Sequence, residues 1–76
     1  MDILSVSVRV LAVLERLVSE RAGGSFFWEE VVSAVRAEKI PVKNWLLVRR
    51  ILAGSFLAPG RFVRVDDIFR ETYRVN

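Results

Sequence analysis

The sequence contains neither cysteine nor histidine. Without cysteine there is no disulfide framework and no thiolate that could bind a metal. Without histidine, the chain cannot form a Ser-His-Asp triad, a Cys-His nucleophile or a zinc-finger site, and it has no imidazole for acid–base catalysis. No other combination of nucleophile, base and metal-binding residues is evident. We therefore expect a protein that is not an enzyme and that carries no cofactor and no metal.

Long uncharged hydrophobic runs are also missing. A membrane-spanning helix needs about 18 or more consecutive apolar residues, and the longest apolar stretch, residues 3–18, is interrupted by Arg9, Glu15 and Arg16. This stretch also lacks the basic start and the small-residue cleavage site of a signal peptide. We expect a soluble, cytoplasmic protein with no membrane partner.

Side-chain amides are scarce. Glutamine is absent, asparagine occurs only at positions 44 and 76, and arginine outnumbers lysine ten to two. Few thermolabile residues are typical of proteins from thermophilic sources.

The composition predicts one small domain whose charge is distributed unevenly along the sequence. We expect residues 1–76 to form a single domain, and at 53% hydrophobic content they carry more apolar surface than so small a core can bury. Residues 1–38 hold four basic and six acidic side chains, a net charge of −2, whereas residues 39–76 hold eight basic and three acidic ones, a net charge of +5. This concentration of positive charge indicates that one face meets an anion.

The first twenty residues predict a long amphipathic helix over residues 2–21, with Asp2 as its N-cap and Gly23 and Gly24 after its end. The apolar arc of this helix is wider than one core-facing side requires. We therefore expect a homodimer through the N-terminal helix, with Leu4, Val8 and Leu11 at the interface. Residues 4–10 also alternate strictly between apolar and polar, which is typical of a strand, so a strand over residues 3–9 is the alternative.

The remaining pattern predicts an α+β fold, mostly helical with a small β-hairpin. A very short strand at Phe26 or Phe27 precedes a second helix over residues 28–38, with Val31, Val32 and Val35 facing inward. Pro41 suits the first turn of a third helix over residues 42–53, which ends at Gly54. Alternating residues 61–65 and 71–75 predict the hairpin, joined by a loop over residues 66–70. We expect Val63, Val65, Tyr73 and Val75 on its inner face, and Phe62, Arg64, Thr72 and Arg74 on its outer face.

Residues 28–57 carry a resemblance to a known superfamily. Within them, residues 48–57 (Val-Arg-Arg-Ile-Leu-Ala-Gly-Ser-Phe-Leu) look like the end of a recognition helix that runs into the first strand of a wing, and residues 72–75 (Thr-Tyr-Arg-Val) look like the last wing strand. With the order of its elements, the chain resembles the winged helix-turn-helix superfamily over nearly its whole length. Small winged-helix proteins of this size are frequent in thermophilic archaea and their viruses.

This resemblance implies a transcriptional regulator whose partner is duplex DNA. The third helix, residues 42–53, would enter the major groove, and the wing, residues 61–75, would contact phosphates. The groove-contacting residues would be Lys43, Asn44, Arg49 and Arg50, and the phosphate-contacting residues would be Arg61, Arg64, Arg70 and Arg74.

Two alternatives remain open at this point. A winged-helix module that binds another protein is favoured by Leu46 and Leu47 on the third helix, by Phe62 on the wing, and by Asp66 and Asp67 at the wing tip. If residues 4–10 were a strand, the chain could instead be a ribbon-helix-helix DNA binder that reads DNA with Ser5, Ser7 and Arg9.

Overall fold

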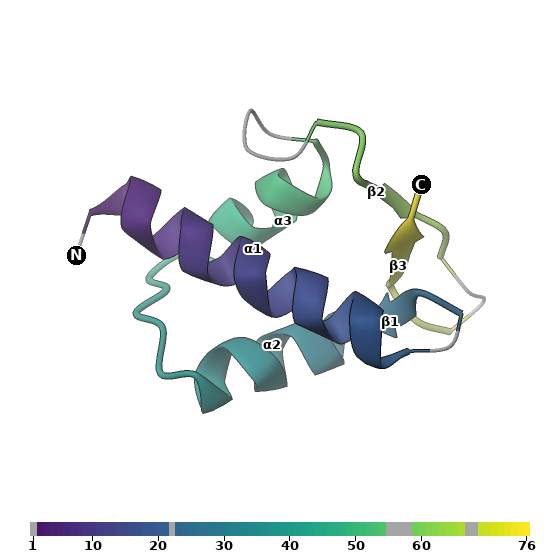
Figure 1. Ribbon diagram of the computed structural model, residues 1–76, viewed down its shortest axis with the longest axis horizontal. Coiled ribbons are helices and arrows are strands. Elements are labelled where there is room, and N and C mark those ends of the chain that lie inside the picture. The colour runs from purple at the N-terminus through teal and green to yellow at the C-terminus, as the bar shows by residue number, and fades with distance from the viewer. Residues whose placement is uncertain (1, 22, 55–58, 67–68) are drawn as a thin grey trace.

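The computed structural model describes residues 2–21, 23–54, 59–66 and 69–76. In chain order the elements are α1 (Ile3–Glu20), β1 (Ser25–Phe27), α2 (Trp28–Ala37), α3 (Leu46–Leu52), β2 (Phe62–Arg64) and β3 (Thr72–Val75). The described residues thus form an α+β fold of three helices and a three-stranded antiparallel sheet, which confirms the predicted order. Figure 1 shows α2 and α3 on either side of α1, with the sheet gathered near the C-terminal end of α1. The residues that resemble the entry into the first wing strand, 55–57, and Asp67 lie outside the described residues.

The N-terminal segment is helical from Ile3 onward, so the strand alternative for residues 3–9 is wrong. The Asp2 side chain accepts a hydrogen bond from the backbone N–H of Ser5 at 2.7 Å, which makes it the N-cap. Val6 and Val10 are buried, but Val8, which a strand would bury with them, is 52% exposed. This spacing of buried residues is helical. Because residues 3–9 are not a strand, the chain lacks there the N-terminal strand that a ribbon-helix-helix protein requires.

The sheet has the order β1-β3-β2, and its register corrects the predicted faces of the hairpin. Phe62 pairs with Val75, and Arg64 pairs with Tyr73. Directly paired residues of antiparallel strands point to the same side, so Phe62 and Arg64 share the face of Tyr73, and Val63 lies on the other face with Arg74. Phe62 is only 5% exposed. The prediction for β2 was therefore wrong by one residue, which reverses every side chain of a strand.

The third helix begins later than predicted. Residues 42–45 are not helical, and α3 contains only Leu46–Leu52. The Asn44 side-chain oxygen accepts a hydrogen bond from the backbone N–H of Leu46 at 3.0 Å and so caps the first turn. Pro41 therefore belongs to the preceding loop and not to the first turn of this helix. The predicted end is confirmed, since Gly54 has a left-handed φ of 98° directly after the last turn.

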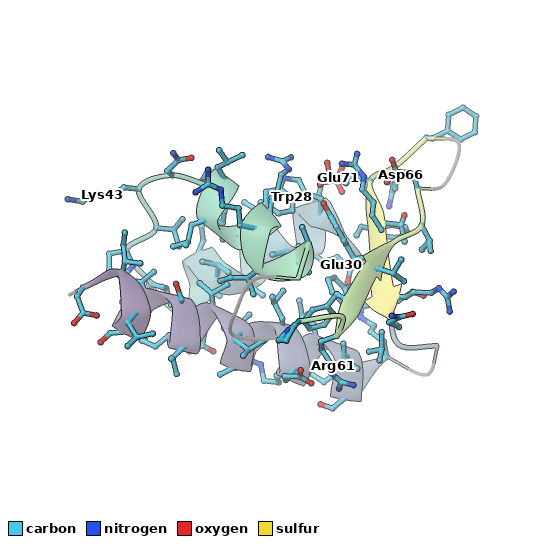
Figure 2. The ribbon with its side chains drawn as sticks, turned by 90° about the horizontal axis from the view of Figure 1, so that it is seen from above. Trp28, Glu30, Lys43, Arg61, Asp66 and Glu71 are labelled. Atoms are coloured by element: carbon cyan, nitrogen blue, oxygen red, sulfur yellow. The ribbon has the colours of Figure 1, made fainter. Side chains whose placement is uncertain are left out.

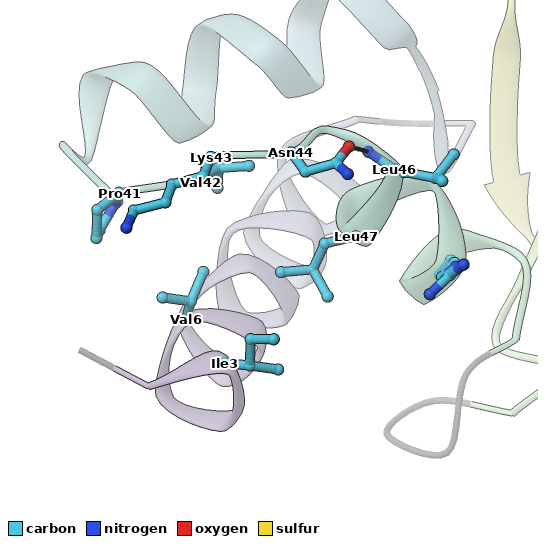
Figure 3. A pocket seen from close by; sticks show the side chains of 9 residues that line it. Ile3, Val6, Pro41, Val42, Lys43, Asn44, Leu46 and Leu47 are labelled. Carbon is cyan, nitrogen blue, oxygen red and sulfur yellow. Dashed lines mark hydrogen bonds between the residues drawn. The ribbon is translucent and has the colours of Figure 1, made fainter.

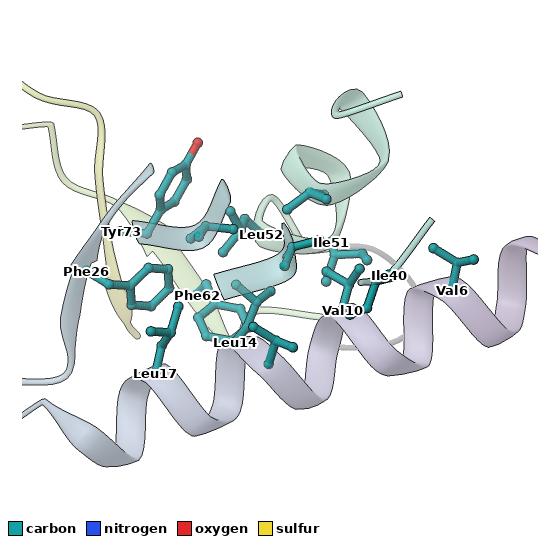
Figure 4. Packing of buried hydrophobic residues seen from close by; sticks show 14 residues of the cluster. Val6, Val10, Leu14, Leu17, Phe26, Ile40, Ile51, Leu52, Phe62 and Tyr73 are labelled. Carbon is teal, nitrogen blue, oxygen red and sulfur yellow. The ribbon is translucent and has the colours of Figure 1, made fainter. Parts of the chain in front are cut away.

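One hydrophobic core holds the helices and the sheet together. Val10 and Leu14 of α1, Ile51 of α3 and Phe26 of β1 are at most 1% exposed, and Figure 4 shows them within one cluster. The Phe26 ring stacks on Tyr73 at 6.2 Å between centroids. The Tyr73 hydroxyl points out of this cluster (Figure 4). The core thereby fixes the position of α3 relative to the hairpin.

Candidate nucleic-acid interface

Arg61, expected to contact phosphate, lies in an ion pair within the chain. Its Nε and Nη2 atoms donate to the two carboxylate oxygens of Glu15 at 2.9 and 2.7 Å. This pair joins the start of the hairpin to α1, and the hydrogen bond from Arg61 lowers the pKa of Glu15. Figure 2 shows Arg61 beside α1, on the opposite side of the view from Lys43.

Arg49 is held by the hairpin and by an aromatic ring. Its Nε and Nη2 atoms donate to the two carboxylate oxygens of Glu71, both at 3.2 Å. Its guanidinium lies 4.0 Å from the centre of the Trp28 ring, close enough for a cation–π contact. The sequence reasoning identified Arg49 but not these partners, because Glu71 is 22 residues away along the chain.

Glu71 is the acceptor at the centre of a small polar network. It also accepts a hydrogen bond from the Tyr73 hydroxyl, and its carboxylate lies 3.7 Å from Nη2 of Arg64. The hydrogen bond from Arg49 lowers the pKa of Glu71, while burial and the hydrogen bond to Glu71 raise the pKa of Tyr73 to about 12. Arg64 in turn donates to Asp66 at 2.7 Å. Both Arg49 and Arg64 therefore have a carboxylate of their own chain as partner.

A row of guanidinium and aromatic contacts runs across α2 and the start of α3, in the order Arg49, Trp28, Trp45 and Arg36. Trp28 meets Trp45 edge to face at 6.1 Å between centroids, and Arg36 lies 5.7 Å from the centre of the Trp45 ring. Both rings are half buried and pack against the core. Arg36 was not among the candidates, because nothing in the linear sequence connects it with a residue nine positions later.

A different set of cations has no acidic partner in the part of the chain that the structure describes. In the described ranges, no carboxylate lies at ion-pair distance from six basic residues, which include four of the eight predicted contact residues. The six are Arg36, Lys39, Lys43, Arg50, Arg70 and Arg74. Lys43 and Arg50 line the same cavity at the start of α3, and Arg70 lies over the Phe27 ring at 4.7 Å. The loop before α3 and α3 itself therefore present uncompensated positive charge.

Large apolar side chains are exposed on α3, in the loop between β2 and β3, and on α1. Leu46 on α3 is 49% exposed and Phe69 in the loop between β2 and β3 is 89% exposed. On α1, Leu4 is 54% and Val8 is 52% exposed, while Leu11 is partly buried against the core. Of the predicted dimer contacts, Leu4 and Val8 are thus available to a partner.

No family model, curated protein or solved structure matches the chain. Among the described residues, no group of three or more acidic side chains could hold a metal ion. None of the helices in the described ranges has the length and apolar character needed to cross a bilayer.

Proposed function

We propose that the protein binds duplex DNA as a transcriptional regulator of the winged helix-turn-helix type, with α2 and α3 as the helix-turn-helix and β2 and β3 as the wing. The order of the elements and the pairing of β1 with β3 support this architecture. The observation that carries the proposal is the positive charge of Lys43, in the loop before α3, and of Arg50, on α3, neither of which has a carboxylate at ion-pair distance among the described residues. Phosphate neutralisation by such side chains dominates the affinity of proteins for DNA.

The dimensions of α3 suit the major groove. α3 is an α-helix of seven residues, and the diameter of an α-helix with its side chains, about 10–12 Å, matches the groove width of about 12 Å. Arg50 is exposed, so its guanidinium can reach a phosphate at the edge of the groove. The side-chain oxygen of Asn44 already accepts a hydrogen bond from Leu46, so one of its two acceptor positions remains for adenine.

On the wing, Arg70 and Arg74 are the cations that we assign to phosphates. Arg64 and Arg61 are already paired with Asp66 and Glu15, so a phosphate would have to compete with a carboxylate for them. This division separates the predicted contact residues into those that bind DNA and those that support the fold.

Fluorescence anisotropy with a mixed-sequence duplex across a salt series tests the proposal. Each lost phosphate contact should reduce the slope of log affinity against log salt by about 0.9. We expect Lys43→Gln and Arg50→Gln to reduce the slope by about this amount each. The matched control is Arg61→Gln, which removes one charge on the opposite side of the view in Figure 2 and should leave the slope unchanged.

The result that would sink the DNA proposal is the absence of binding by the folded protein at low salt. A slope that falls equally in all three variants would show that only net charge matters. The first result favours the second candidate, a winged-helix module for protein assembly, and the second result refutes the placement of α3 on DNA. The side chains of Leu46, on α3, and Phe69, in the loop between β2 and β3, are exposed and are the apolar groups that a protein partner would cover.

We also propose that two copies associate through the exposed side of α1. Leu4 and Val8 are four residues apart and so lie on one side of the helix. Sedimentation equilibrium should give a dimer for the wild type and a monomer for Leu4→Glu. Ser5→Glu, an equal charge at the neighbouring exposed position, should remain dimeric. A monomeric wild type at high concentration would refute the interface.

A further inference from the structure

A cavity of about 470 Å³ lies between the start of α1, the loop before α3 and α3 itself. Its apolar wall is formed by residues of all three segments. Figure 3 shows Ile3, Val6 and Leu47 between the two helices, with Val42 on the loop side. The volume falls within the range of about 300–1,000 Å³ that is typical of sites for small ligands.

The polar side chains that line this cavity in the described part of the chain all offer hydrogen-bond donors to a ligand. Lys43 and Arg50 line it, and neither has a carboxylate partner in the described part of the chain. The side-chain oxygen of Asn44 accepts a hydrogen bond from the backbone N–H of Leu46 (Figure 3). The NH₂ group of Asn44 therefore remains available to donate to a ligand. No acidic residue is among the lining residues. The lining therefore combines an apolar floor with two cations and an amide donor.

We propose that this cavity binds a small amphipathic anion, a straight hydrocarbon chain that ends in one carboxylate. The chain lies against Ile3, Val6 and Leu47, and the carboxylate meets Lys43 and Arg50. A partner made only of apolar side chains, such as the α1 surface of a second copy, would leave these two charges buried without a counter-charge, which is unfavourable. The proposal does not depend on DNA binding, but because it uses Lys43 and Arg50, a bound anion would compete with DNA.

Decanoate, kept below its micelle concentration, is the probe, and a two-dimensional ¹H–¹⁵N NMR titration at physiological salt is the measurement. We expect saturable shifts at Ile3, Val6, Val42 and Leu47. Octanoate should bind about 4- to 16-fold more weakly, because it buries two methylene groups fewer. Acetate, which has the charge without the chain, and decanol, which has the chain without the charge, should both bind at least tenfold more weakly than decanoate.

Two double variants test the role of the cations. Lys43→Gln/Arg50→Gln should weaken decanoate binding at least tenfold. Arg70→Gln/Arg74→Gln removes the same charge from the wing and should leave the affinity unchanged, with amide spectra of both variants confirming the fold. The proposal is overturned if decanoate causes no saturable shifts, or if its shifts lie along Leu4 and Val8 instead of the cavity. Equal binding of decanol, or cavity shifts that depend on protein concentration alone, would also overturn it, the latter by identifying a second copy as the occupant.

Discussion

Replacing Glu71 with glutamine removes the charge that holds α3 to the hairpin and leaves the shape of the side chain nearly unchanged. Glu71 is 18% exposed and accepts both hydrogen bonds of Arg49 in addition to that of the Tyr73 hydroxyl. Hydrogen bonds to charged groups contribute about 1.5–3 kcal/mol each, but Arg49 is 39% exposed, so solvent screens the pair. We expect Glu71→Gln to lower the free energy of unfolding by about 1–2 kcal/mol at pH 7. In a domain of this size, that lowers the midpoint temperature by about 4–16 °C.

The pH dependence identifies the charge as the cause. Because Arg49 lowers the pKa of Glu71 in the folded state, the pair stabilises the protein above the unfolded-state pKa of about 4.3. That stability is lost as the pH falls through the folded-state pKa. The difference between wild type and Glu71→Gln should therefore be constant from about pH 6 to 8 and shrink in acid.

Urea denaturation followed by circular dichroism at several pH values measures this difference. Glu29→Gln is the matched control, because Glu29 is exposed at the start of α2 and has no ion pair within the described residues. It should change the stability by no more than a few tenths of a kcal/mol. Equal stability of wild type and Glu71→Gln at pH 7 would refute the reasoning, and a difference that persists in acid would assign the loss to packing.

Three further outcomes are expected. Arg61→Gln should lower stability slightly at low salt and hardly at all at high salt, because its pair with Glu15 is exposed; thermal melts at two ionic strengths test this, and an effect independent of salt would contradict it. Burial and Glu71 raise the pKa of Tyr73, the sole tyrosine, to about 12, so its absorbance should change at a pH well above the usual value of about 10. The free energy of unfolding should fall as the pH rises from about 10 through about 12. Glu71→Gln should move the absorbance change to lower pH. Leu14→Ala should cost about 2–5 kcal/mol because Leu14 is fully buried, and denaturation in urea that shows less than about 1 kcal/mol would refute the assigned core.

Much of the element pattern followed from the sequence alone. The cap at Asp2, the burial of Val31 and Val35, and the stop at Gly54 depend on chemistry within a few residues, so local pattern predicted α1, α2 and the end of α3. The start of α3 was misplaced because Pro41 is compatible with either a first helical turn or a loop. The observed choice depends on the Asn44 cap and on the fit of the loop beside α1.

Other features were decided only by tertiary structure, because they join residues far apart in sequence. The sequence of β2, Phe62–Arg64, allows either Phe62 or Val63 to face the core. The structure places Phe62 on the core side, because its ring packs against that of Phe26 at 5.9 Å between centroids. Likewise, the sequence reveals ten arginines but not which have partners. Pairing with Glu15 and Glu71 commits Arg61 and Arg49 to the fold, whereas Arg50 lies at α3 with no carboxylate beside it in the described ranges. Composition by itself therefore determined that the chain is rich in positive charge, and long-range pairing decided where that charge remains available to a partner.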